Sequence, residues 1–124
     1  MDKTNWLPFI KAAVERNPVC FNDLKGKSHQ EVFEILDNMP DHSIYDDQRL
    51  SLPDEVWNFR RGDGIEKALL LADYILQYDS SASLTIEIEN KKVLLTLKGE
   101  RYNFTSHKSF RKSIEISGNR YIIN

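Results

Sequence analysis

The stretch VWNFRRGDGIEKALLLADYIL, residues 56–76, decides how this chain folds. From Asp63 onward its apolar residues recur at helical spacing, and further leucines widen the apolar surface. A helix that is apolar around most of its circumference is typically buried. Asp63 and Glu66 have the spacing of a capping box, in which each side chain accepts a hydrogen bond from a free amide of the first turn. We therefore expect a central buried helix that begins at Asp63.

Three more helices are expected before it. Residues 4–16 carry apolar side chains on one helical face, and Asn17-Pro18 ends that run. A second capping box, Ser28 to Glu31, starts a helix that stops before Pro40. The segment 52–60 reads as a short helix with proline in its first turn, where a missing N–H costs nothing. Residues 41–50 between these two helices read as an acidic surface loop.

The apolar period changes from 3.6 to 2 at residue 83. Alternation is clear in 84–90 and 91–99, and 101–106 offers two aromatic residues for one face. Residues 114–123 read as a hairpin, because Gly118-Asn119 can supply the positive φ angles of a tight turn. Helices first and strands second predict one α+β domain. We expect the helical part, 1–79, to pack on an antiparallel meander of four or five strands in 83–124.

The composition fits a soluble globular chain of one domain, with 124 residues, 40% apolar and 29% charged. No apolar run has the length of a membrane-spanning helix, and the first residues lack a signal-peptide pattern. We therefore expect a cytoplasmic protein without a membrane partner.

The net charge of −2 is divided unevenly along the chain. Residues 1–81 hold 9 Lys+Arg against 15 Asp+Glu, and residues 82–124 hold 8 against 4. This asymmetry is open to three interpretations: the two halves attract each other, both are solvated faces, or the second half offers a basic surface to an anionic partner. The candidates for such a surface are Arg101, Tyr102, Lys108, Arg111 and Lys112. The acidic total and the lack of a known motif make nucleic acid a poor candidate.

Cysteine and histidine patterns favour no cofactor. Cys20 is the one cysteine, and its neighbours Val19 and Phe21 favour a buried thiol over a reactive one. No two histidines have the spacing of a zinc motif. The aspartates of 41–47 lack the spacing of a calcium loop. We expect neither a metal nor a cofactor.

The order of parts resembles the transglutaminase-like cysteine protease family over residues 50–106. In that family a short helix precedes an Arg-x-Gly-Asp-Cys turn, a long apolar helix and an antiparallel sheet. The residues that carry the resemblance are Pro53, Glu55, Val56, Arg60 or Arg61, Gly62, Asp63, Lys67 and Ala68. The resemblance implies a catalytic cysteine at the helix start, activated by the helix dipole, with a histidine and an aspartate on the following strands.

This sequence departs from that pattern at all three catalytic positions. The cysteine position is Gly64. The histidine position falls at Lys91 or Lys92, and the aspartate position at Thr105 or Ser106. Loss of one member of such a triad costs orders of magnitude in rate. We therefore expect no catalytic residues and no enzymatic activity.

The resemblance then implies a remnant site around Gly64, Asp63, Arg61 and Trp57. Tyr102, Phe104 and His107 are candidates for lining a groove there, although the aromatic pair also fits a core. The main hypothesis is a catalytically inactive domain that binds a protein, a peptide or a small ligand in that groove or at a sheet edge. Two alternatives stay open: an enzyme with different chemistry at Cys20 or in the loop 41–47, and an unrelated α+β domain that binds an anionic partner.

Overall fold

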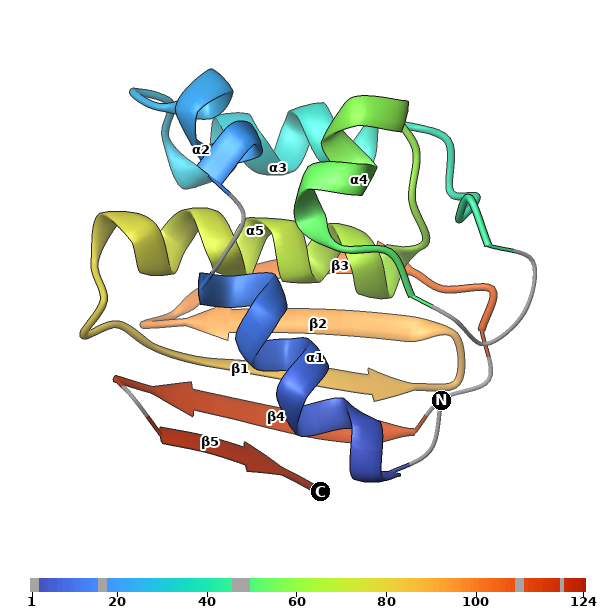
Figure 1. The fold of residues 1–124 in the computed structure, drawn as a ribbon, viewed down its shortest axis with the longest axis vertical. Helices are drawn as coiled ribbons and strands as arrows, with labels where there is room; N and C mark the ends of the chain where they lie inside the picture. The colour runs from blue at the N-terminus through green and yellow to red at the C-terminus, as the bar shows by residue number, and fades with distance from the viewer. Residues whose placement is uncertain (1–2, 16–17, 46–49, 109–110, 119) are drawn as a thin grey trace.

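The computed structural model describes residues 3–15, 18–45, 50–108, 111–118 and 120–124, which form helices packed on a five-stranded antiparallel sheet (Figure 1). The α+β prediction is therefore confirmed. The helices are α1 Lys3–Glu15, α2 Pro18–Leu24, α3 His29–Asp37, α4 Pro53–Phe59 and α5 Gly64–Tyr78. The strands are β1 Ser83–Glu89, β2 Lys92–Leu97, β3 Glu100–Thr105, β4 Lys112–Ser117 and β5 Arg120–Ile123.

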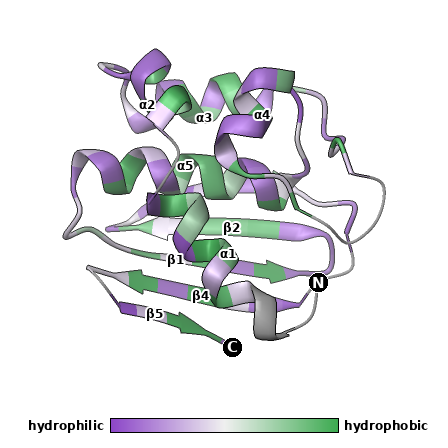
Figure 2. Ribbon diagram, in the orientation of Figure 1, coloured by the Kyte–Doolittle hydropathy of each residue, from purple (hydrophilic) through white to green (hydrophobic). Residues whose placement is uncertain are grey.

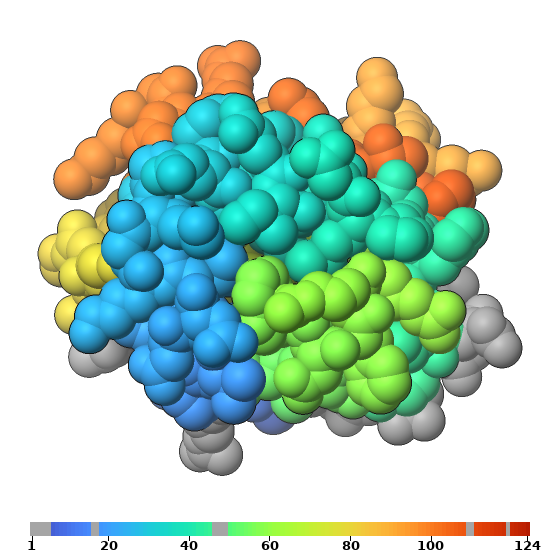
Figure 3. All heavy atoms as spheres, turned by 90° about the horizontal axis from the view of Figure 1, so that it is seen from above, coloured from blue at the N-terminus to red at the C-terminus, as the bar shows by residue number. Residues whose placement is uncertain are grey.

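Helix α5 lies at the centre, as its sequence predicts. Every residue from Gly64 to Leu76 is buried. Strands β1, β2 and β3 lie under it, α1 lies beside it, and α2, α3 and α4 cover it from the other side (Figure 1). Seen from that side, the side chains of α2, α3 and α4 form the outer surface above α5 (Figure 3).

The strands alternate between core and solvent as expected, and Figure 2 shows the alternation along β4. Leu84, Ile86 and Ile88 of β1 are buried, and the residues between them point to the opposite face. The turn glycine Gly118 has a φ of 61°, as the hairpin prediction requires, whereas Asn119 lies outside the described residues.

The sheet is not the meander that we expected from the order of the strands. Its strand order is β3-β2-β1-β4-β5, so β4 pairs with β1 instead of β3. This arrangement places the apolar β1 in the centre and puts β3, with its exposed Arg101 and Asn103, at one edge. Strand periodicity gives the face of each residue but not the neighbour of each strand, which is why the meander prediction was wrong.

Helix α2 is the one helix of the described chain that the sequence pattern missed. Pro18 ends the preceding run, as expected, but it also begins the next helix at a position where proline is favoured. The first amides of α2 are capped by Asp54 of α4, whose carboxylate accepts from Val19 N at 3.3 Å and from Cys20 N at 2.9 Å. A cap from 34 residues away leaves no local signal in the sequence.

Candidate functional site

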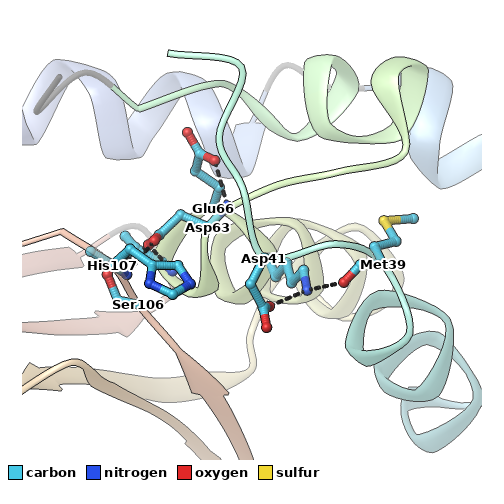
Figure 4. Close-up of polar contacts among 8 residues, drawn as sticks. Met39, Asp41, Asp63, Glu66, Ser106 and His107 are labelled. Atoms are coloured by element: carbon cyan, nitrogen blue, oxygen red, sulfur yellow. Dashed lines mark hydrogen bonds and ion pairs between the residues drawn. The ribbon is translucent and has the colours of Figure 1, made fainter. Parts of the chain in front are cut away.

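The N-terminus of α5 is a dense polar junction between three parts of the chain (Figure 4). Asp63, 1% exposed, caps the helix by accepting from Ile65 N at 3.0 Å. The same carboxylate accepts from the Ser106 hydroxyl at 2.7 Å and from His107 N at 2.7 Å. Asp63 therefore holds the chain that leaves β3 against the start of the helix.

Glu66, the second residue of the capping box, holds the loop before α4. Its Oε1 accepts from Asp63 N at 2.8 Å, and its Oε2 accepts from the Ser43 hydroxyl at 2.7 Å and from Ser51 N at 2.6 Å. Because both oxygens of this buried carboxylate are engaged within the protein, neither faces an open site.

Lys67, the next residue of α5, belongs to the same polar junction, and its partners Met39 and Asp41 are labelled in Figure 4. This fully buried ammonium donates to the Met39 carbonyl at 2.7 Å and pairs with Asp41 Oδ1 at 2.5 Å. A buried lysine needs such partners because an unpaired buried charge is strongly destabilising. Lys67, which the family resemblance matched to the long apolar helix after the turn, thus anchors the end of α3 to the core.

Gly64, the expected nucleophile position, has no room for a side chain. A Cβ on Gly64 would lie 2.4 Å from the Thr105 carbonyl oxygen and 2.6 Å from its carbonyl carbon. The obstacle is backbone, which cannot rotate aside as a side chain can. The predicted remnant site is therefore closed at Gly64. The absence of a side chain there allows helix α5 to lie directly against β3.

The positions that the family resemblance assigned to the three triad members nevertheless lie close together. Thr105 touches Gly64 and pairs with Lys92 across the sheet, and Lys91 O accepts from Ser106 N at 2.9 Å. Lys91 and Lys92 are exposed, whereas the Ser106 side chain is buried against Asp63. The predicted positions are neighbours, but the contacts that join them are made by the backbone.

Trp57 and Arg61 were also predicted for the remnant site. Trp57 donates from its indole nitrogen to Asp23 of α2 at 2.6 Å, and Arg60 stacks on its ring at 3.5 Å. Arg61 is exposed.

Tyr102 and Phe104 do not line a groove. Both are buried, and each ring centroid lies 5.2 Å from that of Phe33 of α3. The two aromatic residues are therefore core residues between the sheet and α3.

His107 has an exposed side chain that stacks on the exposed ring of His42, with centroids 5.6 Å apart and an interplanar angle of 15°. The sequence does not reveal this contact because His42 and His107 come from loops that are far apart in the chain. Among the described residues no group of three or more metal-ligating side chains occurs. Asp46 and Asp47 of the acidic loop lie outside the described residues.

Cys20 is buried between two aspartates. Its Sγ donates to Asp73 Oδ2 at 3.3 Å, and Gln77 donates to the other oxygen of Asp73 at 2.8 Å. Burial, with the nearby charges of Asp73 and Asp54, raises the pKa of the Cys20 thiol. Burial also raises the pKa of Asp73 to about 7. The thiolate needed for nucleophilic chemistry is disfavoured here, which argues against the Cys20 alternative.

The basic residues of the C-terminal half are separated or engaged. Lys108 is buried and donates to the Tyr45 carbonyl, at 3.4 Å. Arg111 pairs with Glu89 at 2.5 Å, and the Lys112 ammonium lies 5.8 Å from the centre of the Trp6 ring. These contacts weaken the case for a continuous basic surface.

One open hollow of the described residues lies on the sheet face opposite the helices. Its volume is about 510 Å³, and outward-facing residues of β1, β2, β3 and β4 form most of its floor. It is lined by Glu87, Ile88, Glu89, Asn90, Lys92, Leu94, Asn103, Arg111, Lys112, Ser113 and Asn124. Strand alternation identifies these residues as exposed, but only the strand order brings them together.

Comparison of the chain with family models, with curated proteins and with solved structures finds no match. Within the described residues, no helix combines the length and apolar character needed to cross a membrane.

Proposed function

We propose that this chain is a catalytically inactive transglutaminase-like domain that binds a peptide or protein partner. The observation that carries the proposal is the contact of Gly64 with the Thr105 backbone, which leaves no space for a nucleophile. A cysteine introduced at Gly64 would have to displace β3 before it could react. The environment of Cys20 supplies no substitute nucleophile.

The partner binds on the open face of the sheet, in the hollow described above. Glu87 and Glu89 offer acceptors, Lys92 and Arg111 offer cationic donors, and Asn103 offers an amide. This set matches an extended segment that carries backbone amides and charges of both signs. The exposed pair of Arg111 and Glu89 can exchange partners at small cost, because surface ion pairs contribute little.

A photo-crosslinking residue introduced at Asn103 tests this location in cells of the source organism. The matched control carries the same residue at Gln30, which is exposed on α3. We expect a defined partner to be crosslinked from position 103 and not from position 30. Crosslinking of a defined partner from position 30 alone would place binding on the helical side and contradict the proposal.

The partner found in this way is then tested as a purified protein. Glu87→Arg changes a charge inside the hollow, and Glu34→Arg makes the same change on exposed α3. We expect Glu87→Arg to weaken binding about tenfold or more and Glu34→Arg to leave it unchanged, since reversing a contacting charge costs more than about 1.4 kcal/mol. Equal affinity of Glu87→Arg and wild type would overturn the assignment.

A further inference from the structure

We propose that two copies of this chain associate through β5, whose free edge pairs antiparallel with the β5 edge of the second copy. The pairing joins the two sheets into one continuous sheet with a two-fold axis at Ile122. This inference does not depend on the proposed function, although it would place two of the hollows described above on one common face.

The first support is the direction of the β5 backbone groups. Ser113 and Asn124 exchange two hydrogen bonds, at 3.2 and 2.9 Å, which fixes the alternation of the β4–β5 ladder. By that alternation Arg120 and Ile122 also bond to β4, so the N–H and C=O of Tyr121 and Ile123 point to the opposite side. Among the described strands none lies on that side, since β5 ends the strand order.

The second support is that this edge is complementary to itself. When two β5 strands run antiparallel about Ile122, Tyr121 stands opposite the second copy's Ile123, and the reverse pair forms on the other side of the axis. The backbone N–H and C=O groups of both residues point to the free side, so each residue can exchange two backbone hydrogen bonds with its partner. A two-fold interface requires such a match of a surface with itself.

The third support is the side chain at the axis. Ile122 is 52% exposed on the outer face of the sheet. In the proposed pairing it faces the second copy's Ile122 in a pair without hydrogen bonds, where Cβ atoms lie about 4.5–5.5 Å apart. Both side chains are then covered. Arg120 stands opposite the second copy's Asn124, so the register brings no like charges together.

The inner side of the same edge is partly apolar. Leu7 of α1, 46% exposed, borders a hollow together with Tyr121, Ile123, Lys112 and Asn124. β5 has one charged residue, Arg120, and carries neither the lysine nor the proline that commonly protect an edge strand. The apolar residues on both sides of this strand edge favour pairing with another strand.

The other edge of the sheet is less accessible. The bond from Ser106 N to Lys91 O places the backbone groups of Thr105 on the free side of β3, where Gly64 packs against them. The start of α5 therefore blocks β3 at this end, whereas no described strand lies against the free side of β5 along its length.

The test begins with the mass in solution, measured by sedimentation equilibrium over a range of concentrations. We expect wild type to approach twice the 14.5 kDa of one chain as concentration rises. Ile122→Lys places two ammonium groups across the axis and is expected to remain a monomer. The control Phe59→Lys replaces a 60% exposed apolar residue at the end of α4 and is expected to dimerise like wild type. A monomeric wild type, or a dimeric Ile122→Lys, would overturn the proposal.

Disulfide trapping tests the register. Under mild oxidation Ile122→Cys should form a disulfide between copies, because residue 122 faces its own counterpart and Cβ separations in such pairs are close to those of disulfides. Arg120→Cys should not, because residue 120 faces residue 124. The native Cys20 is buried and does not interfere. Trapping at 120 but not at 122, in folded protein, would show a different pairing.

Discussion

The side chains of Cys20 and Asp73 are controlled by burial, and their behaviour is testable at the scale of single residues. We expect the Cys20 thiol of the folded protein to react with a thiol reagent at pH 8 about a hundredfold or more slowly than in urea, because burial and two neighbouring carboxylates disfavour the thiolate. A thiol reagent that gives a chromophore measures both rates. Equal rates would revive the alternative of chemistry at Cys20.

The raised pKa of Asp73 predicts that the stability of the fold depends on pH. Its folded-state pKa of about 7 lies above the ordinary value of 3.8, so between these values the folded protein binds the proton more tightly than the unfolded chain. The stabilisation is therefore complete below about pH 4 and is lost as the pH rises through about 7. Asp73→Asn removes this titration, and asparagine keeps the shape of the side chain.

Urea unfolding at pH 5 and pH 8 measures this effect. From pH 5 to pH 8 we expect the free energy of unfolding of wild type to fall by about 2 kcal/mol more than that of Asp73→Asn. The difference between the two proteins isolates Asp73, since all other groups titrate in both. Parallel pH profiles would show that the Asp73 carboxyl has an ordinary pKa.

At the scale of elements, two helices begin with a capping box but differ in what the cap holds. Ser28, which caps α3, exchanges its capping hydrogen bonds with Glu31 on the surface. Asp63 of α5 is buried and also binds Ser106 and His107. The sequence predicted both boxes correctly because they are local, but it could not reveal the two long-range bonds of Asp63.

Alanine substitutions at these two caps should therefore have unequal effects. We expect Ser28→Ala to lower the free energy of unfolding by about 1 kcal/mol, the usual cost of a lost cap. Asp63→Ala should cost about 3 kcal/mol, because the donors of Ser106 and His107, directly after β3, also lose their acceptor. Denaturant unfolding of both variants checks this comparison, and equal losses would mean that the bonds to Ser106 and His107 contribute nothing.

The same distinction explains what could be predicted about the other elements. Strands β1 and β2 follow from the alternation of apolar residues, and helix α5 follows from the helical spacing of its apolar residues and from its capping box. Helix α2 depends on Asp54, and the pairing of β4 with β1 depends on long-range contacts. For the candidate site, the sequence placed Gly64, Lys92 and Thr105 near each other, but it could not reveal that the space between them is closed.

At the scale of the whole molecule, the helices cover one face of the sheet and leave the other open (Figure 1). The close contact of α5 with β3 at Gly64 is a part of this arrangement, because it brings the central helix down onto the sheet. The start of α5, which the family resemblance assigned to an active site, is used for packing. The open face of the sheet is available to a partner.

The most direct test of this claim is the stability of Gly64→Ala compared with Gly62→Ala, measured by denaturant unfolding. At Gly62 the nearest atoms that a Cβ would meet are side-chain atoms, the Val56 methyl groups at 3.1 and 3.2 Å and the Glu66 carboxylate at 3.4 Å, so we expect a change within about 1 kcal/mol. At Gly64 the Cβ would meet backbone at 2.4 Å, and we expect a loss of about 3 kcal/mol. If the space beside Gly64 were open, alanine would instead stabilise the helix by up to about 1 kcal/mol. A Gly64→Ala protein as stable as wild type, or more stable, would contradict the closed site and reopen the remnant groove.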